Sequence, residues 1–296
     1  MSAERMRVLV AGGTGFLGKA ITRRLDQEGV EIRVAGRSTG VDLRDADAVD
    51  RLPACEVVVH VAGSGSVVAP GDDPAAERDA HLTITGHLLE HARRCGARVV
   101  AASTFVYGTA ARVPAAEDDP VAPHSDYTMT RWRAEESCRA FHHAHCVPVD
   151  VLRVFNAYGP HQPASFVIPS IVAGAIAGRI ALADPAPRRD FVHVDDVARA
   201  FALAARRREP GFTVVNIGSG ESRSIGSIAR EAARLAGGDV EIAWSGRVRA
   251  AEVPDARADI ARAARVLDWR PAIRFDDGLA ALIATARASS AGRDAR

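Results

Sequence analysis

The stretch Val8-Leu9-Val10-Ala11-Gly12-Gly13-Thr14-Gly15-Phe16-Leu17-Gly18 decides the fold, because a buried apolar run ends there in a burst of glycines. A helix pattern follows at once, so the stretch predicts a strand, a tight turn and a helix. Gly13–Gly18 matches the G-x-G-x-x-G dinucleotide fingerprint, and Gly12, Gly15 and Gly18 also fit a G-x-x-G-x-x-G spacing. One glycine permits the sharp turn, one lets a pyrophosphate approach the backbone, and one lets helix and strand pack closely. The helix N-terminus adds free N–H groups. The alternative is an ordinary glycine-rich turn. The motif lies directly after a first strand and before a helix, which favours cofactor binding.

Composition limits the class of protein. The 296 residues suffice for one large or two smaller domains. A formal net charge of +1 gives no electrostatic reason to expect nucleic acid as a partner. No run approaches the roughly 18 apolar residues of a membrane span, and the N-terminus runs directly into the first predicted strand, which leaves no room for a signal peptide. The four cysteines, which have no C-x-x-C spacing, are expected to be reduced thiols in a cytoplasmic protein. They are Cys55, Cys95, Cys138 and Cys146.

Strand and helix patterns alternate along the first half of the chain. The predicted strands are Arg7–Ala11, Glu31–Ala35, Val41–Leu43, Val57–Val61, Arg98–Ala102 and Val149–Val154. The predicted helices between them are Phe16–Glu28, Ala46–Leu52, Ala80–Cys95 and Tyr127–Ala144. This alternation predicts an α/β fold with a doubly wound parallel (Rossmann) sheet. Only residues 36–40 precede the strand at Val41–Leu43, too few for the crossover helix that a parallel pair normally needs.

After Val154 the pattern loosens into shorter units, which indicates a smaller C-terminal α/β domain at the carboxyl edge of the sheet, where such folds bind ligands. We predict a dinucleotide-binding domain over residues 1–156, with the chain returning to it around 192–212. Residues 157–191 and 213–288 would form the substrate-binding domain. Residues 289–296 are expected to be a disordered tail.

The residues at the end of the second strand bear on cofactor choice. NAD-binding folds place an Asp or Glu about 20 residues past the glycines, where it binds the ribose hydroxyls. This chain has Gly36-Arg37 there. A carboxylate would repel a 2′-phosphate, whereas a guanidinium binds one bidentately. The sequence therefore favours NADP(H), with NAD(H) as the alternative if Arg37 is simply a solvated surface arginine.

A hydroxyl and a tyrosine–cation pair form the candidate catalytic group. Ser103 stands at the carboxyl end of a predicted strand, and Tyr127 and Arg131 lie four residues apart on a predicted helix, so they share a face. Such a group can polarise a carbonyl and pass it a proton.

Several motifs together carry a resemblance to a known family. They are Gly12–Gly18, Asp42-Leu43, His60-Val61-Ala62, Ala102–Gly108, Tyr127 with position 131, Leu152–Pro160, Arg189–Val197 and Asn216–Gly220. As a set they resemble the extended short-chain dehydrogenase/reductases, the NAD-dependent epimerase/dehydratase family, whose members mostly work on nucleotide sugars. The resemblance extends over nearly the whole chain.

The resemblance implies a role for each matching residue. Tyr127 would be the general acid or base, Ser103 would hold the substrate oxygen, and the cation at 131 would favour the tyrosinate and hold the nicotinamide ribose. The implied cofactor site comprises Gly12, Gly15, Phe16, Leu17, Gly18, Arg37, Asp42, Leu43, Val61, Ala62, Tyr127 and Arg131. The implied substrate site comprises Thr104, Asn156, Arg189 and Arg249, the last as a candidate for a nucleotide diphosphate. The resemblance also implies a homodimer built on two helices of each copy.

The chain departs from the family at informative positions. Arg131 stands where the family has Lys; it keeps the positive charge but cannot release a proton. Thr104-Phe105 replaces the acidic pair of the family's dehydratases, which makes dehydration an unlikely reaction. The missing acid after strand two resembles the NADPH-dependent 4-keto-sugar reductases. The expected activity is therefore reduction of a keto group on a nucleotide-linked deoxysugar. The alternatives are an epimerase with tightly held NAD(P) and a cofactor-binding sensor or scaffold without turnover.

No metal site is expected. His87 and His91 lie four residues apart on a predicted helix, but the sequence shows no third ligand, which favours surface or subunit-contact roles.

Overall fold

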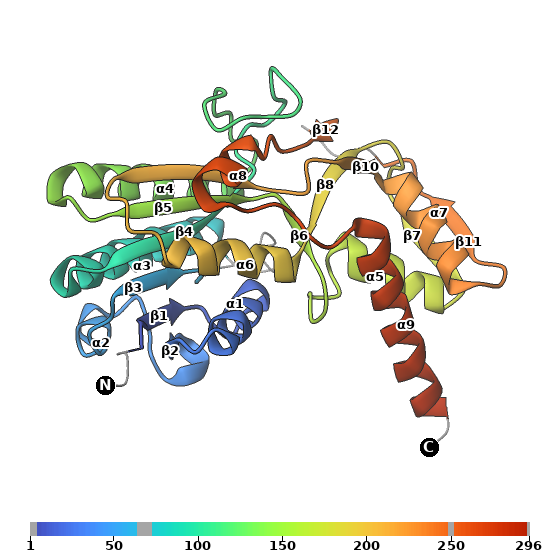
Figure 1. Ribbon diagram of the computed structural model, residues 1–296. Helices are drawn as coiled ribbons and strands as arrows, with labels where there is room; N and C mark the ends of the chain where they lie inside the picture. The colour runs from blue at the N-terminus through green and yellow to red at the C-terminus, as the bar shows by residue number, and fades with distance from the viewer. Residues whose placement is uncertain (1–4, 64–72, 248–251, 295–296) are drawn as a thin grey trace.

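A parallel sheet of six strands forms the centre of the larger lobe in the part of the chain that is described (Figure 1). The computed structural model describes residues 5–63, 73–247 and 252–294. In spatial order the strands are β2 (Glu31–Ala35), β1 (Arg7–Ala11), β3 (Val57–His60), β4 (Arg98–Thr104), β5 (Val149–Val154) and β9 (Phe212–Ile217). Neighbouring strands all pair in parallel. Because β1 lies between β2 and β3, the strand order reverses there, and the carboxyl ends of β1 and β3 border a ligand crevice.

Helices cover both faces of this sheet, as the alternating pattern predicts. One face carries α1 (Phe16–Gln27), α6 (Val194–Ala205) and α8 (Ala261–Leu267). The other carries α2 (Ala46–Asp50), α3 (Pro74–Cys95) and α4 (Asp126–His145). Strands buried between two helical layers are apolar on both sides, which explains the continuous apolar runs Val8–Ala11 in β1 and Val57–Val59 in β3.

A smaller lobe stands beside the sheet, at the right of Figure 1. Its helices α5 (Val167–Ile176), α7 (Ile225–Ala236) and α9 (Phe275–Asp294) share a third apolar core. Its short strands are β6 (Asn156–Tyr158), β7 (Arg179–Leu182), β8 (Arg188–His193), β10 (Ser222–Ser224), β11 (Glu241–Trp244) and β12 (Asp255–Ala256). The predicted fold class, a doubly wound sheet with a smaller C-terminal α/β unit, is confirmed.

Three local predictions are wrong. Val41–Leu43 forms no strand: η1 (Arg37–Thr39) follows β2, and the Val41 N–H donates to the Gly36 carbonyl at 3.1 Å instead of entering a ladder. Residues 213–217 belong to the sheet of the larger lobe, because β9 pairs with β5 along its whole length. The predicted tail is helical as far as residue 294, where α9 ends.

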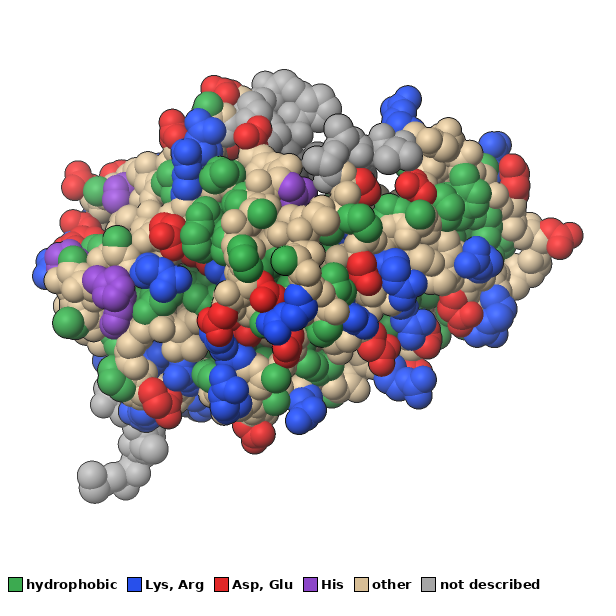
Figure 2. Space-filling model, turned by 90° about the horizontal axis from the view of Figure 1, so that it is seen from above, with side chains coloured by type: hydrophobic (Ala, Val, Ile, Leu, Met, Phe, Trp, Pro, Cys, Tyr) green, Lys and Arg blue, Asp and Glu red, His purple; other side chains and the backbone are tan. Residues whose placement is uncertain are grey.

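None of the helices in the described part of the chain has both the length and the apolar character that a bilayer crossing requires. Figure 2 shows basic and acidic side chains interspersed over the face seen from above, in keeping with the formal net charge of +1.

Candidate active site

A cavity of about 450 Å³ opens at the carboxyl ends of β1, β2 and β3. Gly12 begins the turn after β1 with φ of +87°, and a Cβ there would lie 2.6 Å from the Ala62 backbone. A Cβ on Gly18 would overlap the Gly12 carbonyl oxygen, so this glycine allows α1 to pack on the turn. Gly15 is the N-cap of α1 and lines the cavity. Gly12 and Gly18 thus allow the turn and the close packing that the spacing predicts, and Gly15 leaves bare backbone and a helix N-terminus at the cavity.

The loop after β2 closes one end of the cavity with basic and hydroxyl groups. Arg37 and Ser38 line it, and the Ser38 hydroxyl hydrogen-bonds that of Thr14 at 2.7 Å, which joins this loop to the glycine turn. Asp42 also lines it, but its carboxylate is paired with Arg44 at 2.7 Å. The Arg44 guanidinium lowers the pKa of Asp42 to about 2. Asp42 is therefore ionised and neutralised by its neighbour.

A capping box places Tyr127 in the first turn of α4. The Ser125 hydroxyl accepts from the Thr128 N–H at 3.2 Å, and the Thr128 hydroxyl accepts from the Ser125 N–H at 3.0 Å. One turn further on, the Arg131 guanidinium lies 5.2 Å from the centre of the Tyr127 ring. The structure thus brings the predicted tyrosine and cation together, with Tyr127 half-buried and Arg131 buried.

Arg131 also contacts a histidine that the sequence analysis did not select. Its Nη1 lies 3.2 Å from Nε2 of His81, and the rings of His81 and His60 stack with centroids 5.3 Å apart. Burial, reinforced by the positive charge of Arg131, lowers the pKa of His60 to about 3 and that of His81 well below 6.5. Both imidazoles are neutral at physiological pH, so His81 presents an uncharged partner to the guanidinium.

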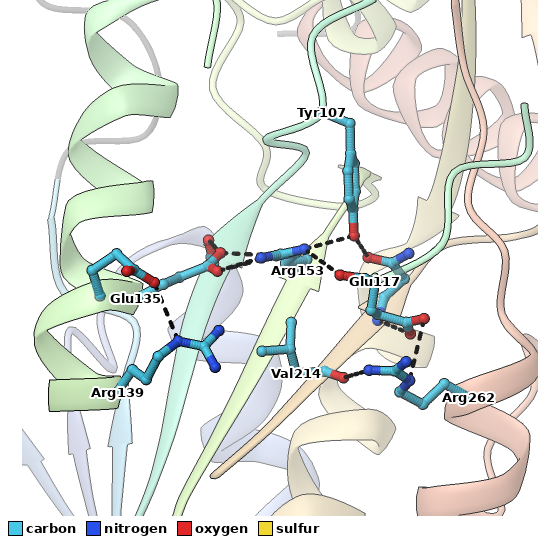
Figure 3. A network of polar contacts seen from close by, with 10 residues as sticks. Tyr107, Glu117, Glu135, Arg139, Arg153, Val214 and Arg262 are labelled. Carbon is cyan, nitrogen blue, oxygen red and sulfur yellow. Dashed lines mark hydrogen bonds and ion pairs between the residues drawn. The ribbon is translucent and has the colours of Figure 1, made fainter. Parts of the chain in front are cut away.

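Ser103 is buried and bonded to a polar network, of which Figure 3 shows Glu135, Arg153 and Tyr107. Its hydroxyl donates to Glu135, whose carboxylate receives two N–H groups of Arg153, with Nη2 at 2.7 Å. Arg153 also donates to the Tyr107 hydroxyl at 2.9 Å, which in turn donates to Asn216. The network ties α4 to strands β4, β5 and β9 beneath the candidate site. In this arrangement the Ser103 hydroxyl donates its one hydrogen bond to Glu135. Its oxygen can still accept a hydrogen bond from another group.

The structure gathers part of the predicted cofactor set around the cavity. The predicted residues that line it are Gly12, Gly15, Arg37, Asp42, Leu43, Val61 and Ala62. Phe16 and Leu17 instead pack against the apolar core under α1. Lining residues that the sequence analysis missed are Thr14, Ser38, Arg44, Glu77, Ala80, His81 and Ile84. Thr14 and Ser38 flank predicted residues and could have been found, whereas Glu77, Ala80, His81 and Ile84 come from α3, which sequence proximity does not reveal.

Three of the four predicted substrate residues, Thr104, Asn156 and Arg189, lie at the junction of the two lobes. Thr104 ends β4 and is half-buried, and the Asn156 side chain donates to the Asp190 carbonyl at 3.1 Å. Arg189 is paired with Glu252 and donates to the Val253 carbonyl at 2.7 Å. Arg249 lies outside the described residues. Glu135 and Arg153 were missed, although Glu135 lies four residues after Arg131 on the same face of α4.

Comparisons with known proteins identify the family of this chain. The model of the NAD dependent epimerase/dehydratase family matches residues 8–218. A UDP-glucose 4-epimerase of Mycolicibacterium smegmatis is 29% identical, over 93% of this chain and 96% of its own length. The solved structure of a Thermotoga maritima UDP-glucose 4-epimerase with UDP-glucose has a TM-score of 0.86 and 25% identity, covering 96% of this chain and all of that one. RMD from Pseudomonas aeruginosa, solved with NADPH, has a TM-score of 0.87 and 28% identity, covering 96% and 99%. The matched residues include both the glycine turn and the tyrosine–cation pair. The chain belongs to the NAD-dependent epimerase/dehydratase family of enzymes.

Proposed function

We propose that this enzyme uses NADP(H) to reduce a keto group on a nucleotide-linked sugar. The observation that carries the proposal is the end of β2, where Arg37 and Ser38 line the cavity in place of a carboxylate. A guanidinium and a hydroxyl can both donate to a 2′-phosphate, whereas a carboxylate would repel it. The acidic Asp42 at this end does not oppose a phosphate strongly, because Arg44 neutralises it.

The residues around the cavity fit a dinucleotide. A side chain at Gly15 would fill the space where bare backbone can approach a pyrophosphate. Asp42 and Leu43 would hold the adenine, and Arg131 the nicotinamide ribose. When bound, the cofactor supplies the hydride for reduction.

Tyr127 donates the proton to the substrate's carbonyl oxygen. Arg131, 5.2 Å from the ring centre, provides fixed positive charge as negative charge develops on the phenolic oxygen. The Ser103 hydroxyl donates its hydrogen bond to Glu135. The serine therefore accepts a hydrogen bond from a substrate hydroxyl, and Tyr127 is the proton donor. Thr104 and Phe105 offer no acid or base for removing water, which argues against dehydration.

The proposed substrate class rests on the junction of the lobes and on the relatives. Arg189 is a cation already oriented by Glu252, and Asn156 adds an amide at the same junction. The Thermotoga maritima relative was solved with UDP-glucose. We expect the nucleotide diphosphate to lie toward the smaller lobe and the sugar toward Tyr127.

Epimerisation with tightly held NAD(P) is a second candidate, favoured by the similarity to UDP-glucose 4-epimerases over 93% of the chain. A cofactor assay separates the two. A reductase consumes NADPH in proportion to a 4-keto nucleotide sugar, whereas an epimerase converts UDP-glucose with no net oxidation of added cofactor. Stoichiometric NADPH oxidation would support the reductase. Epimerisation without NADPH loss, or turnover with NADH alone, would overturn it.

We also propose a homodimer. The predicted neighbours α3 and α4 do lie on the same face of the sheet, packed against one apolar core. Members of this family commonly pair these two helices across a two-fold axis. Light scattering at micromolar concentration should give twice the mass of one chain, and a mass of one chain would contradict the proposal.

A further inference from the structure

A second cluster of chemically reactive side chains lies away from the cavity, at the C-terminal end of α3. His91 and Cys95 are one helical turn apart on α3, and Cys55 approaches them from the loop before β3. Their ligand atoms all lie within 4.8 Å of one another, and in the described part of the chain no other group of three such residues converges in this way. The candidate reaction does not use any of them.

The distances match those of a tetrahedral zinc site. Nε2 of His91 lies 3.6 Å from Sγ of Cys95 and 3.9 Å from Sγ of Cys55. Zinc binds sulfur at about 2.3 Å and imidazole nitrogen at about 2.0–2.1 Å, so tetrahedral angles place the two ligand atoms about 3.6 Å apart. Both nitrogen–sulfur distances are therefore within a few tenths of an ångström of those in a zinc site, and the two sulfurs lie within 4.8 Å of each other.

The His91 ring is placed where a metal ligand is needed. Its Nε2 faces both sulfurs, and the side chain is 2% exposed. An imidazole nitrogen directed at two thiols is a donor set that zinc takes in proteins.

Charge and access also suit a divalent cation. Cys55 is buried, and its sulfur lies within 4.8 Å of that of the partly buried Cys95. A divalent ion that displaces one proton from each thiol forms a neutral unit with two thiolates, which fits a buried site. Cys95 is only partly buried, which gives the ion a route in. The ion pair of Arg94 with Asp50, at 2.5 Å, fastens this end of α3 to α2.

We propose that Cys55, His91 and Cys95 form a structural binding site for Zn²⁺. Two thiolates and one imidazole are borderline-soft ligands that favour zinc over magnesium or calcium. The sequence favoured a surface or subunit-contact role for His91, but its side chain is buried, and Cys55 reaches it from a loop 36 positions earlier.

The test uses the full chain, reduced and stripped of metal, titrated with Zn²⁺ and, as a spectroscopic probe, Co²⁺. Wild type should bind about one ion per chain, release about one proton per thiol and show a thiolate-to-cobalt charge-transfer band. Cys95→Ser and His91→Gln should weaken zinc binding at least tenfold and reduce that band. Cys146→Ser is the matched control, because this exposed thiol at the end of α4 lies outside the cluster and should leave binding unchanged.

Circular dichroism of the metal-free variants checks that they fold. Cys95 is only partly buried, so Cys95→Ser should disturb folding less than a change at a fully buried ligand. The proposal is overturned if wild type binds zinc no more tightly than Cys95→Ser, or if alkylation of the freshly isolated protein shows Cys55 and Cys95 joined as a disulfide. Neither outcome depends on which sugar the enzyme reduces.

Discussion

The guanidinium of Arg131 lies over the ring of Tyr127, 5.2 Å from its centre, and its Nη1 contacts His81 at 3.2 Å. The cation at this family position is therefore held between the candidate proton donor and a neutral imidazole. An arginine makes both contacts at once because its donors are spread over a planar fork.

Tyr127→Phe should lower kcat by a factor of about 10²–10⁴, the usual contribution of a positioned proton donor, while cofactor affinity stays nearly unchanged. Arg131→Ala should harm both turnover and cofactor binding, because the positive charge and the expected ribose contacts are lost together. Steady-state kinetics and a cofactor titration measure the two effects separately. Tyr158→Phe, which removes a buried hydroxyl in the smaller lobe, is the control.

Arg131→Lys tests whether arginine is a tolerated substitute at this position. Lysine keeps the charge and restores the family residue, so activity should be retained or raised. A variant that binds cofactor but has lost turnover would show instead that the fork of Arg131 and its contact with His81 are required.

Arg37→Ala should weaken NADPH binding by about 1.5–3 kcal/mol, as expected for hydrogen bonds to a charged group, and should barely change NADH binding. Calorimetric titration of both cofactors measures this difference. Arg51→Ala removes another exposed arginine that does not line the cavity. Equal losses for the two cofactors, or a wild type that prefers NADH, would remove the basis for NADP(H).

Breaking the buried Glu135–Arg153 pair should cost about 3–5 kcal/mol of unfolding free energy, because one charge remains buried without its partner. The two side chains are 1% and 2% exposed, so solvent cannot compensate. Glu135→Leu in urea denaturation measures this loss, and the double variant with Arg153→Met should recover part of it. A loss below about 1 kcal/mol would mean that the Tyr107 and Glu117 contacts of Arg153 suffice alone.

His60 and His81 should make stability fall in mild acid. Burial lowers the pKa of His60 to about 3 and that of His81 well below 6.5, whereas both regain ordinary values on unfolding. Below about pH 6.5 the unfolded chain therefore binds protons that the folded chain refuses, and unfolding free energy should drop by up to about 1.4 kcal/mol per pH unit for each histidine. Above that pH the two residues contribute no slope.

His81→Asn should make the unfolding free energy depend less steeply on pH between about pH 7 and pH 5, because one of the two histidines that take up a proton on unfolding is removed. Urea denaturation across that range measures it, with the exposed His143→Asn as control. An unchanged slope in His81→Asn would mean that His81 takes up a proton in the folded state.

Local signals made most of the fold predictable. The glycine turn and the buried strands are formed by consecutive residues, so β1, α1 and a doubly wound parallel sheet could be inferred. Val41–Leu43 has a strand composition, but the turn that closes on Gly36 overrides it. The contacts of Glu135 with Ser103 and Arg153, and that of Cys55 with His91, join residues separated by 18 to 36 positions. Such contacts become visible only when helices are placed on the sheet.

The path of the chain between the lobes bears on how such an enzyme can be recombined. The edge strand β9 and the helix α6 come from a segment that the smaller lobe encloses on both sides, between β8 and β10. Arg207, within that segment, forms an ion pair with Asp150 on β5. This pair holds the segment to the sheet of the larger lobe. A single crossover between two related genes would therefore give a hybrid whose sheet has an edge strand from a different parent. Exchange of the substrate lobe alone needs seams on both sides of α6 and β9, so new specificities arise more easily by substitution than by swapping a module.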